Sequence, residues 1–458
     1  MASKCFKSIY RFLTLVMICV MSNSGTVLAD QNPNLELKEA VKIAVDDNPN
    51  LSQMLARYRA FSEIPSQVGS LPDPTINLNA MNLPTNTFST SQEPMTQMQI
   101  GLSQAFPFPG KLSLKKEAAR YEAAAANNDA DEVKLQLTKQ VKVSWWQIYF
   151  LDRSLKILDK NLNLLRQFIK IAQTKYKVGK GLQQDVLLAQ LELSKLLDQK
   201  IQLDSFRVNQ VARLNALMGK NTSSTINLPE EVDLKLPEIL SESVLFEEAR
   251  ISKPTLIKNR NLVKASRSRQ KLADKEYYPD FKVGVNYGDR SGNNAISAGG
   301  GRRSDFASVM LTMTIPLYAK TKQTRGVYQR KYELSQSEFA KQDTYNSILS
   351  DITQGSSEYN RAQEQFKLFK TGILPQARQT VKSMLSGYKV SQVDFLNLVR
   401  SQLTLFNYEV KYWKAFVEAK QALASLESFV GKEDVYAIIS TKSVKSPEKP
   451  KKEKNDNK

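Results

Sequence analysis

Four segments of the chain alternate apolar and polar residues with the period of two that is typical of β-strands. These segments are 74–83, 97–106, 280–288 and 307–316. In the third, Val283, Val285 and Tyr287 are separated by small or polar residues, so one face is apolar and the other polar. Each run has about nine residues, the length that a tilted strand needs to cross a bilayer. Two hairpins of a soluble domain packed on helices would show the same alternation, so the pattern alone leaves both interpretations open.

The segments that connect these strands favour the membrane interpretation. Residues 82–96 and 288–306 are long, polar and rich in glycine or serine, as the external loops of membrane barrels are. Four strands cannot close a barrel, and open strand edges are not tolerated in lipid. If these strands cross a membrane, the chain must therefore form oligomers that close the sheet.

Much of the remaining chain has apolar residues at alternating intervals of three and four, which predicts long helices packed as in coiled coils. The clearest stripe consists of Leu155, Leu158, Leu162, Leu165, Ile169, Ala172 and Tyr176. No proline interrupts 111–219, so we expect a helical hairpin there that reverses at Gly179-Lys180-Gly181. A second hairpin is expected over 321–430, with a bend at Pro375. The outgoing helix of such a hairpin would extend about 100 Å at 1.5 Å per residue, which builds a rod or tube.

The chain contains an internal repeat, because motifs of its first half recur in the second half in the same order. The corresponding pairs are Pro49 and Pro254 (offset 205), Asp73 and Asp280 (207), Pro107 and Pro316 (209), Tyr176 and Tyr388 (212), and Gly219 and Gly431 (212). The offset grows steadily, as expected when loops gain a few residues. Each half is therefore predicted to contain a short amphipathic helix, a second helix ended by a proline–aspartate pair, two strands and a long helical hairpin.

The expected domain organisation follows from this repeat. It consists of a signal peptide (1–29), a first repeat (30–228), a linker (229–237), a second repeat (238–431) and a disordered Lys-rich tail (432–458). The signal peptide has a basic start, an apolar stretch from Phe12 to Met21, and small or apolar residues before Asp30. That apolar stretch is too short for a membrane anchor, which needs about 20 residues. We therefore expect cleavage after Ala29.

Composition excludes several kinds of chemistry. The sequence has no histidine, and its two cysteines, Cys5 and Cys19, lie inside the predicted signal peptide. A mature chain of this kind holds no disulfide, no thiolate or imidazole metal site and no His-based catalytic triad. The sequence also contains no nucleophile elbow and no phosphate-binding loop, so we expect no enzyme activity and no cofactor. Because the chain is predicted to be exported, the net charge of +19 indicates an anionic envelope rather than nucleic acid as its surroundings.

The order and spacing of these motifs resemble the TolC-type outer-membrane efflux proteins over about residues 34 to 431. The resemblance is carried by the duplicated layout, Pro72-Asp73-Pro74, the segment from Gly101 to Lys111, and the hairpin turns Tyr176-Lys177-Val178-Gly179 with Asp185-Val186-Leu187 and Tyr388-Lys389-Val390 with Asp394-Phe395-Leu396. It implies a mainly α fold with a small β part, in which the duplicated long helical hairpins of a homotrimer form an α-barrel. Four strands per chain would then form a shared 12-stranded transmembrane β-barrel.

The same resemblance implies an outer-membrane channel subunit of a tripartite efflux system, acting as a passive exit duct with its tunnel in the periplasm. The implied partners are two further copies of the chain, a periplasmic adaptor protein, an inner-membrane pump of the RND or ABC type, and outer-membrane lipid. Nucleic acid is not among them.

The resemblance also places candidate residues at the two hairpin turns, where the tunnel closes and the adaptor docks. The docking candidates are Val178, Gly179, Lys180, Gly181 and Leu182 in the first turn and Val390, Ser391, Gln392 and Val393 in the second. The pore-constriction candidates are Asp185, Asp394 and Asn397, and a trimer would present Asp394 as a ring of carboxylates that attracts cations. Alternatively, both acids only stabilise the helix N-termini at which they lie. Asn397 stands where related channels often carry a second acid, which weakens the case for a strong acidic gate.

Within this family, Leu71-Pro72-Asp73-Pro74 and the segment 95–111 are most similar to channels that serve cation and heavy-metal pumps. Five methionines, Met81, Met95, Met98, Met310 and Met313, lie in or near the predicted strands. Thioether sulfur binds soft metals. Methionine is also a common apolar packing residue, and we favour that interpretation, so no metal site is assigned.

Two other functions share some of these features. The same duct could serve type I protein secretion, because the inner-membrane partner selects the cargo. A soluble periplasmic coiled-coil scaffold would share the signal peptide and the long helices. A scaffold does not explain four strands of bilayer length, and an adaptor needs only one helical hairpin. An efflux channel is therefore the function that the sequence favours.

Overall fold

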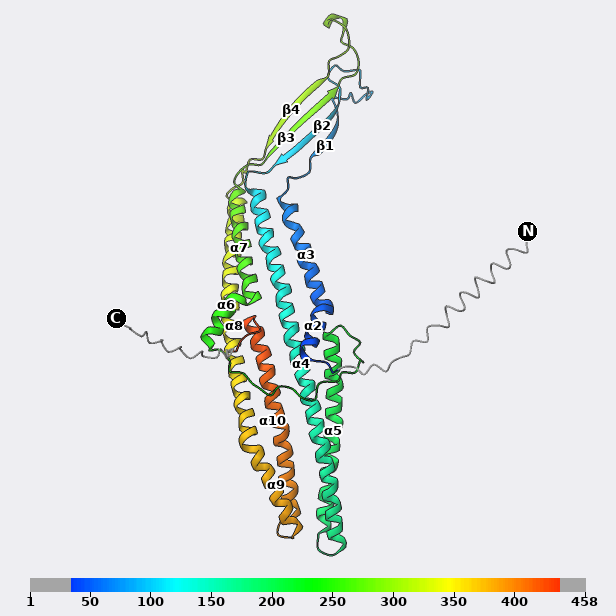
Figure 1. Cartoon of the computed structure of the whole chain (residues 1–458). Helices are drawn as coiled ribbons and strands as arrows, with labels where there is room; N and C mark the ends of the chain where they lie inside the picture. Colours follow the sequence, from blue (N-terminus) through cyan, green and yellow to red (C-terminus); the bar gives the residue numbers. More distant parts are fainter. Residues whose placement is uncertain (1–33, 437–458) are drawn as a thin grey trace, which may run out of the picture.

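A computed structural model describes residues 34–436, which form a long rod with a small sheet at one end (Figure 1). The predicted signal peptide lies outside the described residues, and so does the predicted tail beyond residue 436. Residues 432–436 differ from the expectation of disorder, because Val435 is buried and Tyr436 pairs with Ile239 in an isolated β-bridge. These two apolar side chains pack on the second repeat, and the lysine-rich composition that predicts disorder begins only after them.

The two repeats contain the same elements in the same order. The first repeat has α2 (Leu37–Asp47), α3 (Pro49–Gly69), β1 (Thr75–Met81), β2 (Gln97–Phe106), α4 (Lys111–Lys177) and α5 (Gln183–Leu217). The second has α6 (Glu242–Ser252), α7 (Pro254–Lys275), β3 (Phe281–Asp289), the short η1 (Ile296–Ala298), β4 (Phe306–Met313), α8 (Gln323–Leu368), η2 (Phe369–Ile373), α9 (Leu374–Lys389) and α10 (Phe395–Val430). Two strands are shorter than expected. β1 ends at Met81 because Asn82 adopts a φ of 54°, and β4 ends at Met313, opposite the first residue of β3.

The four strands form one antiparallel sheet in the order β1-β2-β3-β4. Ile76 lies opposite Leu102, Leu102 opposite Val285, and Val285 opposite Val309. This register places most of the apolar residues of all four strands on one face and most of the polar residues on the other. β1 and β4 form the two edges, and the outer side of each has no partner strand within residues 34–436 (Figure 1).

Helices α3, α4, α7 and α8 lie side by side between the sheet and the middle of the rod, and two helical hairpins continue to the far end (Figure 1). α4 runs for 67 residues without interruption. The corresponding helix of the second repeat contains the π-helical segment η2 directly before Pro375. Because proline has no N–H to donate, the wider π turn accommodates it at the position where the sequence predicts a bend.

None of the helices within the described range combines the length and the apolar composition needed to span a membrane.

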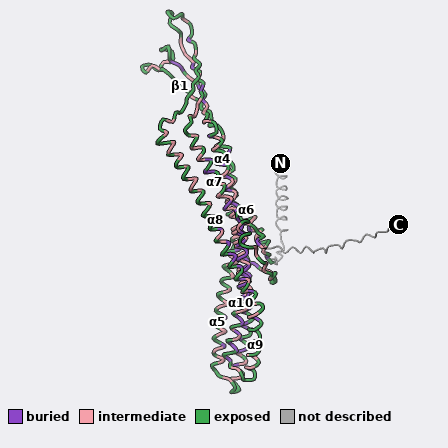
Figure 2. The backbone as a smooth tube through the Cα atoms, turned by 90° about the vertical axis from the view of Figure 1, so that its left-hand side faces the viewer, coloured by how far each residue is buried: buried purple, intermediate pink, exposed green. Residues whose placement is uncertain are grey.

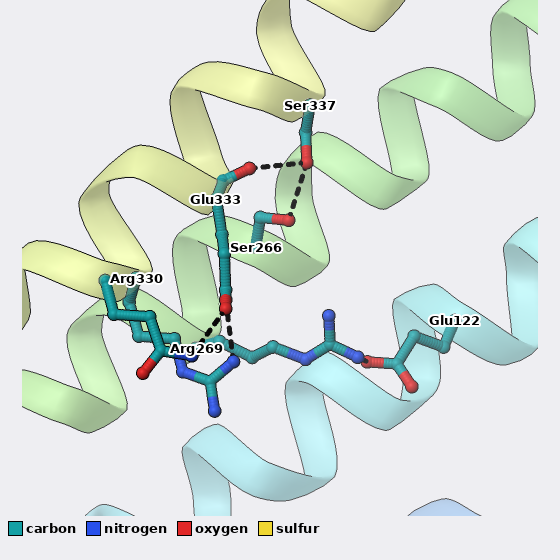
Figure 3. A network of polar contacts seen from close by, with 7 residues as sticks. Glu122, Ser266, Arg269, Arg330, Glu333 and Ser337 are labelled. Carbon is teal, nitrogen blue, oxygen red and sulfur yellow. Dashed lines mark hydrogen bonds and ion pairs between the residues drawn. The ribbon is translucent and has the colours of Figure 1, made fainter. Parts of the chain in front are cut away.

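Polar contacts connect neighbouring helices in the half of the rod next to the sheet, as Figure 3 shows. Arg269 of α7 donates to the Glu122 carboxylate of α4. On the other side of α7, the hydroxyls of Ser266 and Ser337 are 2.9 Å apart. Ser337 lies on α8 and also donates to the main-chain carbonyl of Glu333 at 2.9 Å. These contacts tie α7 to both of its neighbours.

The largest buried cluster lies around the middle of the rod, where the short helix α2 and the linker pack on the long helices (Figure 2). Trp145, Tyr149 and Phe416 are almost completely buried there. Nε1 of Trp145 donates to the carbonyl of Leu35 at 2.9 Å, which fixes the segment before α2 against α4. Burial of one such side chain contributes about 1.5–3 kcal/mol, so this cluster stabilises the middle of the rod.

Each repeat has a tight junction between its short helices and the end of its long hairpin. In the first repeat, Nδ2 of Asn48 donates to the carbonyl of Leu217 at 2.9 Å. A Cβ atom on Gly219 would lie 2.9 Å from the carbonyl oxygen of Asp47. Only glycine permits this approach, which explains why a glycine stands at position 219, the first of the repeated pair Gly219 and Gly431.

The second repeat has the same junction with a charge added. Nζ of Lys253 donates to the carbonyl of Ser428 at 2.8 Å and to the Glu132 carboxylate of α4 at 2.7 Å. Burial by itself raises the pKa of Glu132, but the Lys253 ammonium and further hydrogen bonds outweigh burial and hold that pKa below its ordinary value. A Cβ on Gly431 would lie 2.9 Å from the carbonyl oxygen of Ser252. The second junction thus joins both repeats, because Glu132 belongs to the first.

Replacement of Gly431 tests the close approach at this junction. Gly431 has a φ of +83°. Gly431→Ala should lower the free energy of unfolding by about 2 kcal/mol or more, since a left-handed backbone costs about 1–2 kcal/mol and overpacking adds to that. Thermal unfolding followed by circular dichroism in detergent measures the change. The control is Gly299→Ala, because Gly299 has a φ of +91° but no neighbour within 4 Å. Equal melting temperatures for the two variants would contradict this account.

Candidate functional site: the sheet faces and the hairpin tips

One face of the sheet exposes apolar side chains on every strand. They are Ile76 and Leu78 on β1, Met98, Ile100 and Leu102 on β2, Val283, Val285 and Tyr287 on β3, and Val309, Leu311 and Met313 on β4. Contiguous exposed apolar patches of this kind are rare on soluble monomeric proteins. This apolar face is therefore built to contact an apolar medium or a partner.

The opposite face is lined mainly by amides, hydroxyls and glycines. The side chain of Asn286 lies over Gly101, and that of Gln97 lies over Gly288, so closely that a Cβ on either glycine would overlap the amide oxygen. Lys282 is the one charged side chain on this face within the four strands. The sheet thus presents a polar, nearly uncharged surface opposite the apolar face, and the glycines that permit this packing carried no signal in the sequence pattern.

The five methionines do not form one cluster. Met98 and Met313 lie on the apolar face, Met81 and Met310 lie on the polar face, and Met95 lies in the loop between β1 and β2. Sulfur ligands of a single metal ion would have to converge on one point. Residues 34–436 also contain no group of three or more acidic side chains placed to hold a metal ion. The methionine positions therefore give no support to a metal site in the chain.

The first hairpin tip, residues 178–182, joins α4 to α5 at the far end of the rod. Gly179 has a φ of +71°, and a Cβ on Gly181 would lie 2.9 Å from Cβ of Lys175, so the turn requires both glycines. The apolar side chains of Val178 and Leu182 are 61% and 58% exposed, and Lys180 beside them is also exposed. The turn geometry thus holds apolar side chains out into solvent.

The second hairpin tip, residues 390–394, joins α9 to α10. Val390 is 65% exposed, Gln392 is exposed and Val393 is half-buried against Gly387. Ser391 has a φ of +62°, a left-handed conformation that costs a non-glycine residue about 1–2 kcal/mol. The predicted docking residues of the two turns therefore lie at the same end of the molecule, and each tip exposes a valine.

Lys175 connects the two hairpin tips, and the sequence pattern gives no sign of it. Its Nζ donates to the carbonyl of Tyr388 at 2.6 Å and to Oγ of Ser391 at 3.1 Å, and it lies 4.2 Å from the centre of the Tyr388 ring. The repeat equates Tyr176 with Tyr388, yet Tyr176 is exposed and Tyr388 is buried. The sequence pattern does not predict this difference, because Tyr388 is buried by a contact with the other repeat.

The predicted constriction residues begin the two returning helices. Asp185 lies in the first turn of α5, and Asp394 is the N-cap residue of α10 but makes no side-chain capping hydrogen bond. Burial raises the pKa of Asp185; the Leu182 backbone lowers it, and the nearby charge of Asp394 raises it further, leaving it above the ordinary value. The structure thus brings the acids of the two hairpins into electrostatic contact. Asn397 lies further along α10 and is exposed.

The chain matches the family model described as "Outer membrane efflux protein" over residues 40–220 and 245–432. These two segments cover most of the two repeats. The chain belongs to the outer membrane efflux protein family. The resemblance to TolC-type proteins is therefore confirmed, and so is the outer-membrane location.

Two relatives match the chain over most of its length. Outer membrane protein TolC of Vibrio cholerae is 20% identical over 400 residues, which cover 85% of this chain and 91% of the relative. Cobalt-zinc-cadmium resistance protein CzcC of Cupriavidus metallidurans is 20% identical over 431 residues, which cover 92% and 97%. The chain is thus similar to family members along its whole fold rather than in one segment.

Solved structures show the same fold. The outer membrane protein VceC of Vibrio cholerae aligns with a TM-score of 0.72 at 14% identity, covering 86% of this chain and 96% of VceC. The channel CusC aligns with a TM-score of 0.73 at 15% identity, covering 87% and 93%. The mainly helical fold with a four-stranded antiparallel sheet is therefore that of outer-membrane channels.

Removal of the Lys175 ammonium tests the link between the hairpin tips. Lys175→Met should raise the hydrogen-exchange rate of the amides in 388–394 by roughly three- to ten-fold, because charge-assisted hydrogen bonds contribute about 1–3 kcal/mol and this site is partly open to water. Hydrogen exchange followed by mass spectrometry measures the rate. Lys180→Met is the matched control, since Lys180 is an exposed lysine of the same tip. Equal exchange in both variants would show that Lys175 does not hold the tips together.

Proposed function

We propose that this efflux protein is a homotrimeric exit duct, which carries substrates from an inner-membrane pump and a periplasmic adaptor across the outer membrane. The observation that carries the proposal is the separation of two surfaces along one rod. An exposed apolar sheet face lies at one end, and exposed apolar hairpin tips lie at the other. The first surface suits lipid and the second suits a protein partner.

In this proposal the sheet crosses the outer membrane with its apolar face toward lipid and its polar face toward the pore. Backbone N–H and C=O groups cannot remain unpaired in lipid, so the outer edges of β1 and β4 must find partners. Three copies would close the sheet with twelve strands. The nearly uncharged polar face would then line a passage that does not repel solutes of either charge.

The helical part of the rod also supports association of copies. α5 exposes a stripe of apolar side chains at Leu187, Leu191, Ile201 and Val208. Within the described chain, α5 packs mainly on α4, which leaves this stripe uncovered. Coiled-coil packing would bury such a stripe against the hairpin of the next copy and complete a helical tunnel.

We assign the docking of the periplasmic adaptor to the two hairpin tips. Val178, Leu182 and Val390 present apolar side chains, and Gly179, Lys180, Gly181, Ser391, Gln392 and Val393 shape the turns around them. The adaptor would bridge to an inner-membrane pump of the RND or ABC type. Docking at the tips places the pump at the end of the rod opposite the membrane-spanning sheet.

We assign the pore constriction to Asp185, Asp394 and Asn397 at the same end. A trimer would bring three copies of each acid around the axis, and such a ring attracts cations. Asp394 makes no capping hydrogen bond, which leaves its carboxylate available for this role. Burial and the neighbouring Asp394 raise the pKa of Asp185, so the negative charge that Asp185 contributes to the ring is expected to be lost first as the pH is lowered.

We propose metal cations as the first cargo to test. The support is the likeness to the cobalt-zinc-cadmium resistance protein and the acidic groups at the constriction. A strain that lacks the protein should become more sensitive to zinc, cobalt and cadmium salts. Sensitivity to a lipophilic dye with unchanged sensitivity to the three metals would replace metal export by export of organic compounds.

The trimer is tested by the mass of the purified protein. Light scattering of the detergent extract from outer membranes should give three chains per particle after subtraction of the detergent. Recovery of single chains from the soluble periplasm would instead favour a soluble scaffold and contradict the channel.

Docking is tested at the exposed valines of the tips. The double variant Val178→Asp with Val390→Asp should fold normally, because both side chains are mainly in water, but should abolish export, because charge is costly to bury in an apolar contact. Survival on zinc and cadmium salts, in a strain that lacks the native protein, measures export. Ile296→Asp is the matched control, since Ile296 is 94% exposed at the opposite end. Full resistance in the double variant would exclude the tips as the docking surface.

A further inference from the structure

A buried clasp joins the two repeats where the sheet meets the helices. Lys111, the first residue of α4, is 4% exposed in its side chain, and its Nζ lies 2.9 Å from Oδ1 of Asp280 and 3.3 Å from Oε2 of Glu276. The backbone N–H of Phe108 donates to the same Oδ1 of Asp280 at 2.7 Å. The rings of Phe108 and Tyr278 stack at 4.5 Å. The clasp thus consists of a Phe108–Lys111 half after β2 and a Tyr278–Asp280 half before β3.

Both halves of this clasp occur a second time in the sequence. Leu317 and Lys320 follow β4 at an offset of 209 from Phe108 and Lys111. Leu71 and Asp73 precede β1 at an offset of 207 from Tyr278 and Asp280. These are the offsets that also relate the strands of the two repeats.

The second pair of halves does not meet within the chain. One half lies at the free edge of β1 and the other at the free edge of β4, on opposite sides of the sheet (Figure 1). Leu71 is 49% exposed and Leu317 is 81% exposed. Asp73 and Lys320 make no side-chain hydrogen bond or ion pair with any residue in 34–436. Each edge thus carries one apolar and one charged side chain without a partner in the described chain. The corresponding side chains of the internal clasp contact each other.

We propose that the Leu317–Lys320 half of one copy closes on the Leu71–Asp73 half of the next copy, in the geometry of the internal clasp. Lys320 pairs with Asp73 of the next copy, and Leu317 packs on its Leu71. The inference rests on the homotrimer proposed above and specifies how neighbouring copies fit together. The occupant of each free edge is therefore a second copy of this chain.

The clasp also fixes the register of the strands that meet between copies. Within the chain, Leu102 lies opposite Val285 and Ile100 opposite Tyr287. The offset of 209 relates Leu102 and Ile100 of β2 to Leu311 and Val309 of β4, and the offset of 207 relates Val285 and Tyr287 of β3 to Leu78 and Ala80 of β1. The clasp therefore places Leu311 opposite Leu78, and Val309 opposite Ala80, of the next copy. All four of these residues lie on the apolar face.

This register continues the apolar face without a break from one copy to the next. A slip by one residue would turn apolar side chains toward the polar side and would be costly, whereas a slip by two residues keeps the faces and is distinguished by cross-linking. The pairing that the clasp gives is thus the one that the repeated strands also give.

One difference between the clasps has a measurable effect. Glu276, which supplies the second carboxylate to Lys111, corresponds to Gly69 in the first repeat. The clasp between copies therefore has a single ion pair and should be more sensitive to salt than the internal one.

Cysteine cross-linking tests the register. The predicted mature chain contains no cysteine, so the pair Leu78→Cys with Leu311→Cys introduces the only thiols once Cys5 and Cys19 are also replaced by serine. Residues directly opposite in antiparallel strands have Cα atoms about 4.5–5.5 Å apart, which suits a disulfide. Mild oxidation of membranes should convert most of the protein to covalent trimers on a non-reducing gel. The matched controls, Leu78→Cys with Val309→Cys or Met313→Cys, should remain mostly monomeric.

Charge exchange tests the ion pair. Asp73→Lys and Lys320→Asp should each lower the amount of detergent-stable trimer by roughly ten-fold. In the first variant two lysines face each other at every contact between copies, and in the second variant two aspartates do. The double variant Asp73→Lys with Lys320→Asp should restore the trimer. Lys322→Asp, an exposed lysine close to Lys320, should leave it unchanged.

The outcomes separate this inference from the proposed function. A trimer by light scattering that cross-links best in a control register, or that the double charge variant does not restore, would overturn the clasp and leave the channel intact. A protein that is monomeric without any substitution would overturn both.

Discussion

Backbone N–H and C=O groups at the edge of a sheet need hydrogen-bond partners wherever water is absent, and residues 34–436 of a single chain leave two such edges open. The sheet also exposes an apolar face on all four strands. The exposed apolar face is costly in water, the open edges are costly in lipid, and no other part of the described chain covers the face or pairs with the edges. In the proposed trimer, lipid covers the apolar face, further copies pair with both edges, and the helices below the sheet support the same assembly.

The largest buried cluster of the rod lies at its middle, and a second buried cluster extends along the hairpins toward their tips. The aromatic cluster around Trp145 and Phe416 and the junctions at Asn48 and Lys253 hold the short helices on the long ones. At the far end of the hairpins, Lys175 links the two tips through its hydrogen bonds to Tyr388 and Ser391. Apolar side chains remain exposed on α5 and at the tips, where copies of the chain and a partner are proposed to bind.

Duplication supplies one set of motifs that forms contacts inside the chain and, in the proposed trimer, a second set that forms contacts between copies. A motif that closes a contact between the repeats is present again, unpaired, at the outer edges. The repeats are not identical, however. Asn48 is neutral where Lys253 forms a buried ion pair, and Gly69 replaces Glu276 at the unpaired clasp. The junction of the second repeat is therefore charged where that of the first is neutral, and the proposed clasp between copies has one carboxylate fewer than the internal clasp.

Local patterns in the sequence determined much of the fold. Alternation located the strands and their apolar face, the spacing of apolar residues located the long helices, and glycine marked both junctions and the first tip. Tertiary structure decided what depends on contacts between distant segments. It placed Val435 and Tyr436 on the second repeat, it brought Asp185 beside Asp394, and it turned Tyr388 inward toward Lys175 while Tyr176 remained exposed. A repeat specifies the same local geometry twice, but the neighbours of each copy of a motif arise only when the two halves pack together.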